Sequence, residues 1–362
     1  MNKRTIDIIA STMDRGGAER VISILANHWS ELGYKVKIIL LLGYNSGYKL
    51  NPDVKILSLV NKDLSRWKQI PFWIRHIRST VKKDEPAFVL SFFPKNTIIS
   101  WIATRSLGIK LRFISSERND PRFDGRGKLT AFLSEFVYSK SNAVVFQTTL
   151  VKSLYKRCNP KKTFVIPNPI NEKVFLKACN IRKTGKIVSV GKLEPQKNQK
   201  LLIDAFSVYS RSFPEAHLEI YGVGSLKKEL CNYISSLNLQ NKVILKGNVP
   251  NLHSEIRDAE MFVLTSNYEG FSNALMESLA LGIPTISTDC AGATDLIDDR
   301  ENGLIVPVGG LQELIQAMKC LSLNQSLADY FSSKSKETIQ QFKSSIILPL
   351  WDKACFGDCD PD

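Results

Sequence analysis

The chain has 362 residues, of which 43% are apolar and 23% are charged, as is typical of a soluble enzyme with about two domains. No apolar run approaches the roughly 20 residues that span a bilayer, and the apolar run after the basic amino terminus is too short for a signal peptide. The seven cysteines are odd in number and form no C-x-x-C pair, which argues against a disulfide framework or a zinc site and favours reduced thiols in the cytosol.

The net charge of +14 comes from the first half of the chain. Residues 1–175 contain 30 lysines and arginines against 13 acidic residues, whereas residues 176–362 contain 19 and 22. This asymmetry indicates an anionic partner for the first half, either a nucleic acid, lipid headgroups or a phosphorylated substrate. The alternative is a basic surface that only improves solubility.

The amino-terminal half begins with a strand, a glycine turn, a helix and a second strand. The strands are expected at TIDIIAST (5–12) and KVKIILLL (35–42), and the apolar spacing of residues 21–32 predicts the helix. Gly16 and Gly17 at the start of this helix leave bare backbone for a phosphate or sugar, unless the turn simply needs a positive φ. Further strands of a doubly wound α/β domain are expected at FVLSFF (88–93), LRFISSE (111–117) and AVVFQT (143–148).

A proline-rich stretch, FVIPNPINEKVF (164–175), interrupts this pattern and is the expected linker. We expect two Rossmann-like α/β domains, residues 1–166 and 167–339, that face each other across a cleft. A carboxyl-terminal helix at about 340–356 is expected to pack back on the first domain. The second domain is expected to contain strands at KIVSVGKL (186–193), HLEIYGVG (217–224), VILKGNV (243–249), MFVLTS (261–266), PTISTD (284–289) and GLIVPV (303–308).

Ligands of open parallel sheets bind beyond the carboxyl ends of the strands, so the loops there are candidate sites. Gly191 ends one strand, and Lys192 and Lys197 follow just before a helix that begins near Asn198. Two ammonium groups beside helix amides favour a phosphate, although surface lysines at a helix start are common. Gly222 belongs to a G-x-G that lacks the third glycine of a dinucleotide loop, so a tight turn without NAD is preferred.

Two acids, Glu269 and Glu277, lie in the otherwise uncharged segment SNYEGFSNALMESLALGIPT (266–285). A helix is expected over ALMESLAL, with Ser272 or Asn273 as its N-cap. Acids at a helix start often only complement the helix dipole. Here Glu269 precedes the cap and Glu277 lies about one turn inside, so capping explains neither, and we expect both to face a ligand.

These motifs together resemble the retaining GT-B glycosyltransferases of family 4. The resemblance covers nearly the whole chain in family order. It implies transfer of a sugar from a nucleotide-sugar donor with retention of configuration and without a metal or cofactor. The motifs are GGAERV (16–21), IPNPI (166–170), VGKLEPQKN (190–198), IYGVGSL (220–226), LKGNV (245–249), the E-x7-E of Glu269 and Glu277, and GIPTISTDCAGATDLIDDRENGLIVPVGG (282–310).

The resemblance also implies roles for individual residues. Glu269 would contact the donor sugar, Glu277 the ribose hydroxyls of the nucleotide, and Lys192 and Lys197 the diphosphate, whose developing charge cations and helix amides stabilise. The acidic DCD at 358–360 is expected to be a solvated tail rather than a metal site. The remaining donor contacts would come from Gly16, Gly17, Gly191, Gly222, Asn248, Val249, Gly270, Phe271, Ser272 and Asn273.

One loop departs from the family pattern. Many relatives carry a histidine in the first domain near the reacting carbon, and none of the four histidines lies there. The expected counterpart is ISSERNDPR (114–122), with Arg118 as a catalytic candidate and Glu117 and Asn119 in an acceptor loop; an Arg–Glu pair that only shapes the loop is the alternative. SERNDP resembles relatives that extend lipid-linked glycans of bacterial surfaces, which implies a uridine nucleotide and an N-acetylhexosamine or hexose.

The segment DLSRWKQIPFWIRHIRSTVKKDEP (63–86) mixes basic and aromatic residues, a composition that suits a membrane surface or a polyprenyl-diphosphate-linked acceptor. The alternative is a solvated helix with one buried aromatic face. We therefore expect a cytoplasmic enzyme that associates with the inner face of the plasma membrane and makes a surface polysaccharide such as O-antigen or capsule. The residues concerned are Arg66, Lys68, Arg75, Arg78, Lys82, Lys83, Trp67, Phe72 and Trp73.

Two other functions share part of these features. A GT-B sugar-nucleotide epimerase would have the same fold, but it should lack the E-x7-E and the basic aromatic segment. A nucleic-acid-binding protein is suggested by charge alone, and the chain contains no recognised nucleic-acid motif, so no nucleic-acid partner is expected.

Overall fold

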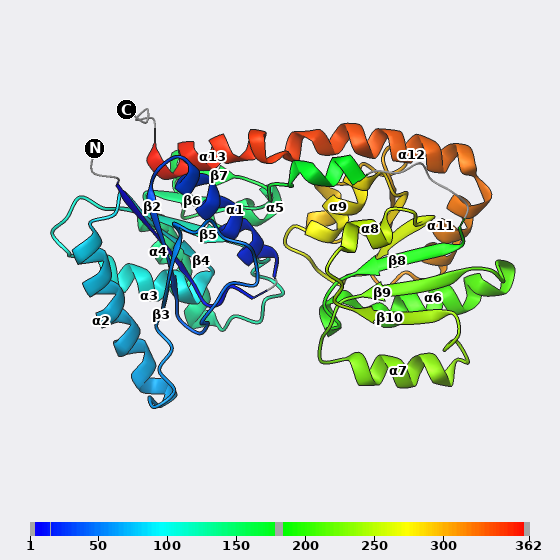
Figure 1. Ribbon diagram of the computed structural model, residues 1–362, viewed down its shortest axis with the longest axis horizontal. Coiled ribbons are helices and arrows are strands. Elements are labelled where there is room, and N and C mark those ends of the chain that lie inside the picture. Colours follow the sequence, from blue (N-terminus) through cyan, green and yellow to red (C-terminus); the bar gives the residue numbers. More distant parts are fainter. Residues whose placement is uncertain (1–3, 15, 178–183, 358–362) are drawn as a thin grey trace. The chain divides into compact units, whose positions relative to one another are not determined.

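The computed structural model describes residues 4–14, 16–177 and 184–357, and the chain forms two compact units (Figure 1). The first unit comprises Met1–Pro169 and Ser345–Asp362, and the second comprises Ile170–Ser344. The chain therefore passes between the units twice, after Pro169 and after Ser344. Each unit is a doubly wound α/β domain with one parallel sheet, which confirms the predicted fold class.

The sheet of the first unit has the strand order β3-β2-β1-β4-β5-β6-β7, so the direction of winding reverses beside β1. All its pairings are parallel, for example β1 with β2 and with β4. Strands covered by helices on both faces consist of near-continuous apolar runs, and β4 and β6 are buried throughout. The strands are β1 (Thr5–Ala10), β2 (Lys35–Leu40), β3 (Lys55–Ser58), β4 (Phe88–Phe92), β5 (Arg112–Glu117), β6 (Ala143–Phe146) and β7 (Thr163–Val165).

Helices cover both faces of this sheet. One face packs against α1 and α13 around Trp29 and Trp351, and the other packs against α2, α3 and α4 around Trp73 and Val137. Hydrogen bonds tie α13 to this unit. Asp352 contacts Trp29 Nε1 at 2.7 Å and His28 Nε2 at 2.9 Å, and Arg112 Nε donates to the carbonyl of Cys355 at 2.8 Å. The helices are α1 (Gly17–Glu31), α2 (Arg66–Asp84), α3 (Pro94–Thr104), α4 (Lys128–Lys140), α5 (Thr149–Ser153), η1 (Pro160–Lys162) and α13 (Ser344–Phe356).

The sheet of the second unit has the order β10-β9-β8-β11-β12-β13, again parallel. One apolar core lies between this sheet and α6, α7, α11 and α12, and another lies between the sheet and α8, α9 and α10. The strands are β8 (Lys186–Val190), β9 (His217–Tyr221), β10 (Val243–Gly247), β11 (Met261–Leu264), β12 (Thr285–Thr288) and β13 (Leu304–Val306). The helices are η2 (Glu172–Lys177), η3 (Pro195–Lys197), α6 (Gln199–Ser212), α7 (Lys227–Ser236), α8 (Leu252–Ile256), α9 (Asn273–Leu281), α10 (Ala291–Thr294), α11 (Leu311–Leu323), α12 (Gln325–Thr338) and η4 (Ile339–Phe342).

Every strand expected from the sequence occurs in the structure, but two strands were not expected. β3 is a short edge strand, and β7 occupies the start of the segment 164–175 that was expected to be linker throughout. The acidic DCD at 358–360 lies outside the described residues. Within the part of the chain that is described, no helix has the length and apolarity needed to cross a bilayer.

Candidate active site

The candidate donor site of the second unit lies at the carboxyl ends of its parallel strands. β8 ends before Gly191, β10 ends at Gly247, and β11 is followed by the loop that carries Glu269. Since all strands of the sheet are parallel, these loops leave the same edge of the sheet.

Glu269 is held by two partners in this loop region. Its carboxylate forms a close ion pair with the ammonium group of Lys197, and it accepts a hydrogen bond from Ser266 Oγ at 2.6 Å. Glu269 is only 6% exposed, so the ion pair is shielded from bulk solvent. Burial and the Glu269 charge also raise the pKa of the nearby Cys290 to about 11, which keeps that thiol protonated at neutral pH.

The loops that carry Lys197 and Glu269 are joined by hydrogen bonds on either side of the ion pair. Thr265 Oγ1 donates to the carbonyls of Lys197 and Asn198 at 3.1 and 3.0 Å. The amide of Asn267 donates to the carbonyl of Gln196 at 2.8 Å. These bonds fix the two loops to each other, so the spacing of Lys197 and Glu269 does not depend on a ligand.

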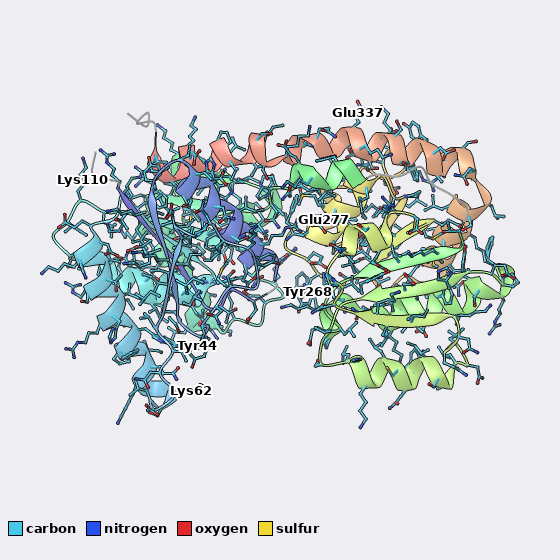
Figure 2. The ribbon with its side chains drawn as sticks, in the orientation of Figure 1. Tyr44, Lys62, Lys110, Tyr268, Glu277 and Glu337 are labelled. Atoms are coloured by element: carbon cyan, nitrogen blue, oxygen red, sulfur yellow. The ribbon has the colours of Figure 1, made fainter. Side chains whose placement is uncertain are left out.

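Glu277 lies on α9, about one helical turn beyond the N-cap, as the sequence predicts (Figure 2). Ser272 is the N-cap, and its side chain accepts from the amide of Leu275. Glu277 is 4% exposed and contacts His253 Nε2 at 3.0 Å. His253 could not be predicted from the sequence, since α8 has only five residues and a single histidine in it carries no motif.

Two predicted glycines serve close approach of the protein's own backbone. A Cβ on Gly222, whose φ is +134°, would lie 2.0 Å from the carbonyl oxygen of Gly191. A Cβ on Gly191 would meet the Lys197 side chain at 3.1 Å, so the bare backbone allows Lys197 to lie across the end of β8. Gly292 also allows a close backbone approach, next to the loop that carries Glu269, because a Cβ on Gly292 would lie 2.2 Å from the carbonyl oxygen of Gly270.

The other predicted donor residues surround this core with differing exposure. Lys192 and Asn248 are exposed, whereas Phe271 is buried and contacts the ring of Phe342. Val249 and Asn273 are partly buried. The structure therefore brings Lys197 and Glu269 into direct contact, places Glu277 as the fifth residue of α9, and leaves Lys192 exposed in the same loop as Lys197.

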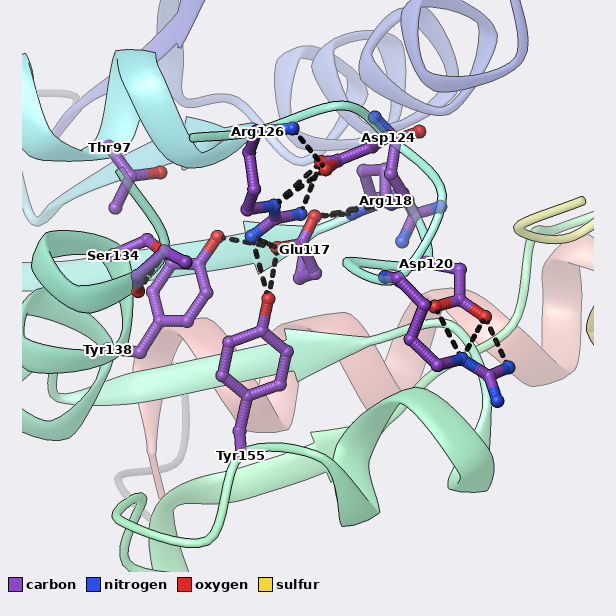
Figure 3. A network of polar contacts seen from close by, with 12 residues as sticks. Thr97, Glu117, Arg118, Asp120, Asp124, Arg126, Ser134, Tyr138 and Tyr155 are labelled. Atoms are coloured by element: carbon purple, nitrogen blue, oxygen red, sulfur yellow. Dashed lines mark hydrogen bonds and ion pairs between the residues drawn. The ribbon is translucent and has the colours of Figure 1, made fainter. Parts of the chain in front are cut away.

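In the first unit, Glu117 lies at the carboxyl end of β5 and is fully buried (Figure 3). Its carboxylate pairs with Arg126 at 2.8 Å and accepts hydrogen bonds from the hydroxyls of Tyr155 at 2.6 Å and Tyr138 at 3.2 Å. Burial and the Glu117 charge raise the pKa of both tyrosines, so the phenols remain donors. The Glu117 carboxylate also accepts from the amides of Arg118 and Asn119 and so anchors the loop that follows β5.

The alternative of a Glu117–Arg118 side-chain pair is not what the structure has, because Glu117 pairs with Arg126 instead. Arg118 is 4% exposed and lies against the rings of Phe92 and Trp351, with its guanidinium carbon 5.8 and 5.7 Å from their centroids. One nitrogen donates to Asn168 Oδ1, but Nε and Nη1 have no partner among the described residues. Burial lowers the pKa of Arg118 to about 9, so it remains charged at neutral pH.

The remaining residues predicted in the first unit lie at two loop positions. Asn119 is exposed beside the buried Arg118. Gly16 is the N-cap of α1 and has φ of −142°, so a positive φ is not the reason for this glycine. Gly17 is the first residue of the helix, and the carbonyl of Gly16 accepts a hydrogen bond from the Tyr48 hydroxyl at 2.8 Å.

The basic aromatic segment 63–86 forms α2, but its aromatic side is largely core. Trp73 is 9% exposed, packs against Ile77 and donates from Nε1 to the carbonyl of Leu59 at 3.1 Å. The expectation that this tryptophan meets a membrane is therefore wrong, because the sheet already covers it. The side chains of Arg66 and Trp67 lie outside the described residues, while the exposed face of α2 carries Lys68, Arg75, Arg78, Lys82 and Lys83.

Among the described residues, no group of three or more His, Cys, Asp or Glu side chains is placed to hold a metal ion.

Comparison with known families accounts for both units. The family described as Glycosyltransferase Family 4 matches residues 15–174, and the family described as Glycosyl transferases group 1 matches residues 175–338. One relative is the N-acetylgalactosamine-N,N'-diacetylbacillosaminyl-diphospho-undecaprenol 4-alpha-N-acetylgalactosaminyltransferase of Campylobacter jejuni. It is 29% identical to this chain over an alignment of 356 positions that covers 93% of this chain and 95% of that protein.

A second Campylobacter jejuni relative is similar over nearly its whole length. It is a GalNAc-alpha-(1->4)-GalNAc-alpha-(1->3)-diNAcBac-PP-undecaprenol alpha-1,4-N-acetyl-D-galactosaminyltransferase, 27% identical with 96% of each chain covered. Among solved structures, Anabaena HepE in complex with UDP has a TM-score of 0.81 at 16% identity, with 97% of this chain and 98% of that chain covered. The apo form of the lipopolysaccharide outer core galactosyltransferase WaaB has a TM-score of 0.77 at 19% identity, with 98% and 100% covered. Two consecutive family matches and the fold together show that the chain belongs to the GT-B glycosyltransferases of family 4.

Proposed function

We propose that the enzyme transfers an N-acetylhexosamine or hexose from a UDP-linked donor to a polyprenyl-diphosphate-linked glycan, with retention of configuration, in bacterial surface-glycan synthesis. The observation that carries this proposal is the shielded contact of Lys197 with Glu269 just before the amino end of α9. A cation, a carboxylate and helix amides within one loop region suit a donor that joins a diphosphate to a sugar. The names of the two Campylobacter relatives, both transferases of undecaprenol-linked glycans, support the acceptor class.

Each side chain of this site has a defined task in the proposed reaction. Glu269 accepts hydrogen bonds from hydroxyls of the donor sugar, and Glu277 accepts them from the ribose. Lys197 and Lys192 hold the diphosphate. As the bond between the sugar and the diphosphate breaks, negative charge grows on the leaving oxygen, and these ammonium groups stabilise it more strongly than they stabilise the bound donor. We propose that no metal is required, since the lysines and helix amides already supply positive charge.

The acceptor hydroxyl attacks from the same face of the sugar that the diphosphate leaves, and its proton passes to the departing phosphate oxygen. The first unit would supply the acceptor side. There, the Glu117 network holds the loop after β5 in one conformation, and Arg118 adds a positive charge at its start. The enzyme would work in the cytoplasm at the inner face of the plasma membrane, where a prenyl-linked acceptor is embedded.

A panel of nucleotide sugars, assayed with a short prenyl-diphosphate glycan, tests this function. We expect a UDP-linked donor to give a glycosylated lipid, and proton NMR of the product to show the anomeric configuration of the donor. Inversion at the anomeric carbon would contradict the retaining mechanism. Conversion of the donor into another nucleotide sugar without any acceptor would instead establish an epimerase.

A further inference from the structure

The side of α4 that faces away from its sheet is apolar. Leu129, Phe132 and Phe136 are 71%, 55% and 39% exposed, and their spacing of three and four residues places them on one face of the helix. The opposite face packs onto the sheet through the buried Val137 and Tyr138. The outer face of such a helix normally carries polar side chains, so this apolar stripe indicates a partner.

Basic side chains border this stripe and contact its aromatic rings. The guanidinium of Arg157 lies 5.7 Å from the ring centroid of Phe132, and the ammonium group of Lys140 lies 5.8 Å from that of Phe136. Residues 128–165 contain seven lysines and arginines and a single acid, Glu135. We refer to Leu129, Phe132 and Phe136 with Lys140 and Arg157 as the α4 surface.

The adjoining segment extends the same composition. Leu150 on α5 and Leu154 directly after it are 41% and 38% exposed, four residues apart. They belong to the part of the chain that supplies Arg157 to the α4 surface. By comparison, the described side chains of α2 expose mainly charge, with Ile70 at 43% as the large apolar residue on its outside.

We propose that the α4 surface docks on a bilayer that contains anionic lipids. Leu129, Phe132 and Phe136 would enter the boundary between headgroups and acyl chains, while Lys140 and Arg157 pair with lipid phosphates. Charge complementarity favours this occupant over a second copy of the chain, since two α4 surfaces brought together would also bring their cations together. The purpose of docking, access to a lipid-linked acceptor, rests on the proposed function, but the docking itself does not.

Co-sedimentation with vesicles tests the proposal. We expect the wild type to bind vesicles of phosphatidylcholine with about one third phosphatidylglycerol, more weakly at high salt, and to bind pure phosphatidylcholine poorly. The variant Leu129→Ser/Phe132→Ser/Phe136→Ser should lose at least about tenfold in partition coefficient, because it removes the apolar area that is buried in the interface. Leu129 and Phe132 are mostly exposed, whereas Phe136 also contacts the ring of Trp101 on α3 at 5.6 Å between centroids, so circular dichroism must show that the variant keeps the wild-type fold.

Two control variants make this experiment specific. Leu32→Ser/Leu323→Ser/Ile346→Ser removes three other exposed apolar side chains and should bind within about twofold of the wild type. Lys68→Gln/Lys82→Gln/Lys83→Gln removes charge from α2 and should weaken binding less than the α4 variant. The proposal is overturned if the wild type does not bind anionic vesicles, if only the α2 variant loses binding, or if sedimentation shows that the α4 variant has lost a dimer instead.

Failure of the surface and failure of the proposed function are distinguishable. Transfer to a short-chain, water-soluble acceptor should be equal in the wild type and in the α4 variant, because the α4 surface is not part of the donor site. Vesicle binding without any transfer would leave the α4 surface intact and contradict the proposed function. Transfer without vesicle binding would support the proposed function and contradict the α4 surface as a membrane-docking site.

Discussion

Replacement of the buried Asp7 by asparagine should change how the first unit responds to pH. Asp7 lies in β1 with no exposed surface, and neither carboxylate oxygen has a partner among the described residues. Burial, reinforced by the charge of Asp84 and opposed by that of Lys37, raises its pKa from 3.8 to about 7. The folded protein therefore binds a proton at Asp7 under conditions in which the unfolded chain has released it.

The sign and size of the effect follow from this shift. Because the folded-state pKa is raised, the stabilising contribution of the protonated group is complete below about pH 4 and is lost as the pH rises toward 7. The rise of the Asp7 pKa from 3.8 to about 7 corresponds to roughly 4 kcal/mol of unfolding free energy between about pH 4 and pH 7. About 3 kcal/mol of this loss falls between pH 5 and pH 8. Asparagine carries no titratable proton. The unfolding free energy of Asp7→Asn relative to the wild type should therefore rise by about 3 kcal/mol when the pH is raised from 5 to 8.

Urea unfolding at pH 5 and pH 8, followed by tryptophan fluorescence, measures this difference. All five tryptophans belong to the first unit, so the signal reports that unit. A difference in unfolding free energy between Asp7→Asn and wild type that is the same at both pH values would refute the buried, proton-binding role of Asp7.

Three further substitutions test the sites. Glu117→Gln should destabilise the first unit by about 2 kcal/mol, because it removes the charged acceptor of Tyr138, Tyr155 and Arg126, although Arg126 keeps its second partner Asp124; a change below about 0.5 kcal/mol in the same unfolding assay would contradict the network. Gly222→Ala should unfold the second unit more readily than Gly309→Ala, since both glycines have positive φ but only Gly222 has backbone where the Cβ would go; differential scanning calorimetry should show the gap, and equal losses would contradict it. Arg118→Met removes a buried cation with two unpartnered nitrogens, so the unfolding free energy should not fall, whereas transfer activity should; unchanged activity would exclude Arg118 from the reaction.

The strands and the start of α9 could be predicted from sequence because they depend on local pattern. Buried parallel strands are apolar runs bounded by glycine, and the side chain of Ser272 caps the helix that it begins. β3 was not predicted, because it is a four-residue edge strand whose sequence, KILS, is too short to show a period. β7 was not predicted, because it has only three residues and lies just before the prolines of the expected linker.

The contacts within the sites depend on tertiary structure and could not be predicted in the same way. Glu117 and Tyr155 are 38 positions apart, and only the adjacent strands bring them together. The same holds for Trp73, whose basic and aromatic neighbours suggested a membrane while the sheet buries it. By contrast, Lys197 and Glu269 were each predicted from a loop motif, and their contact follows from the order of the parallel strands β8 and β11.

The donor site in the second unit is tested most directly by calorimetric titration of UDP into the wild type, Glu277→Gln and Glu260→Gln. Glu277 lies beyond the carboxyl end of β11, whereas Glu260 lies at the amino end of the same strand and serves as the matched control. We expect Glu277→Gln to bind UDP about 10- to 100-fold more weakly, the loss of a hydrogen bond to a charged group, and Glu260→Gln to bind as the wild type does. Equal affinity of the wild type and Glu277→Gln would contradict the placement of the nucleotide at α9.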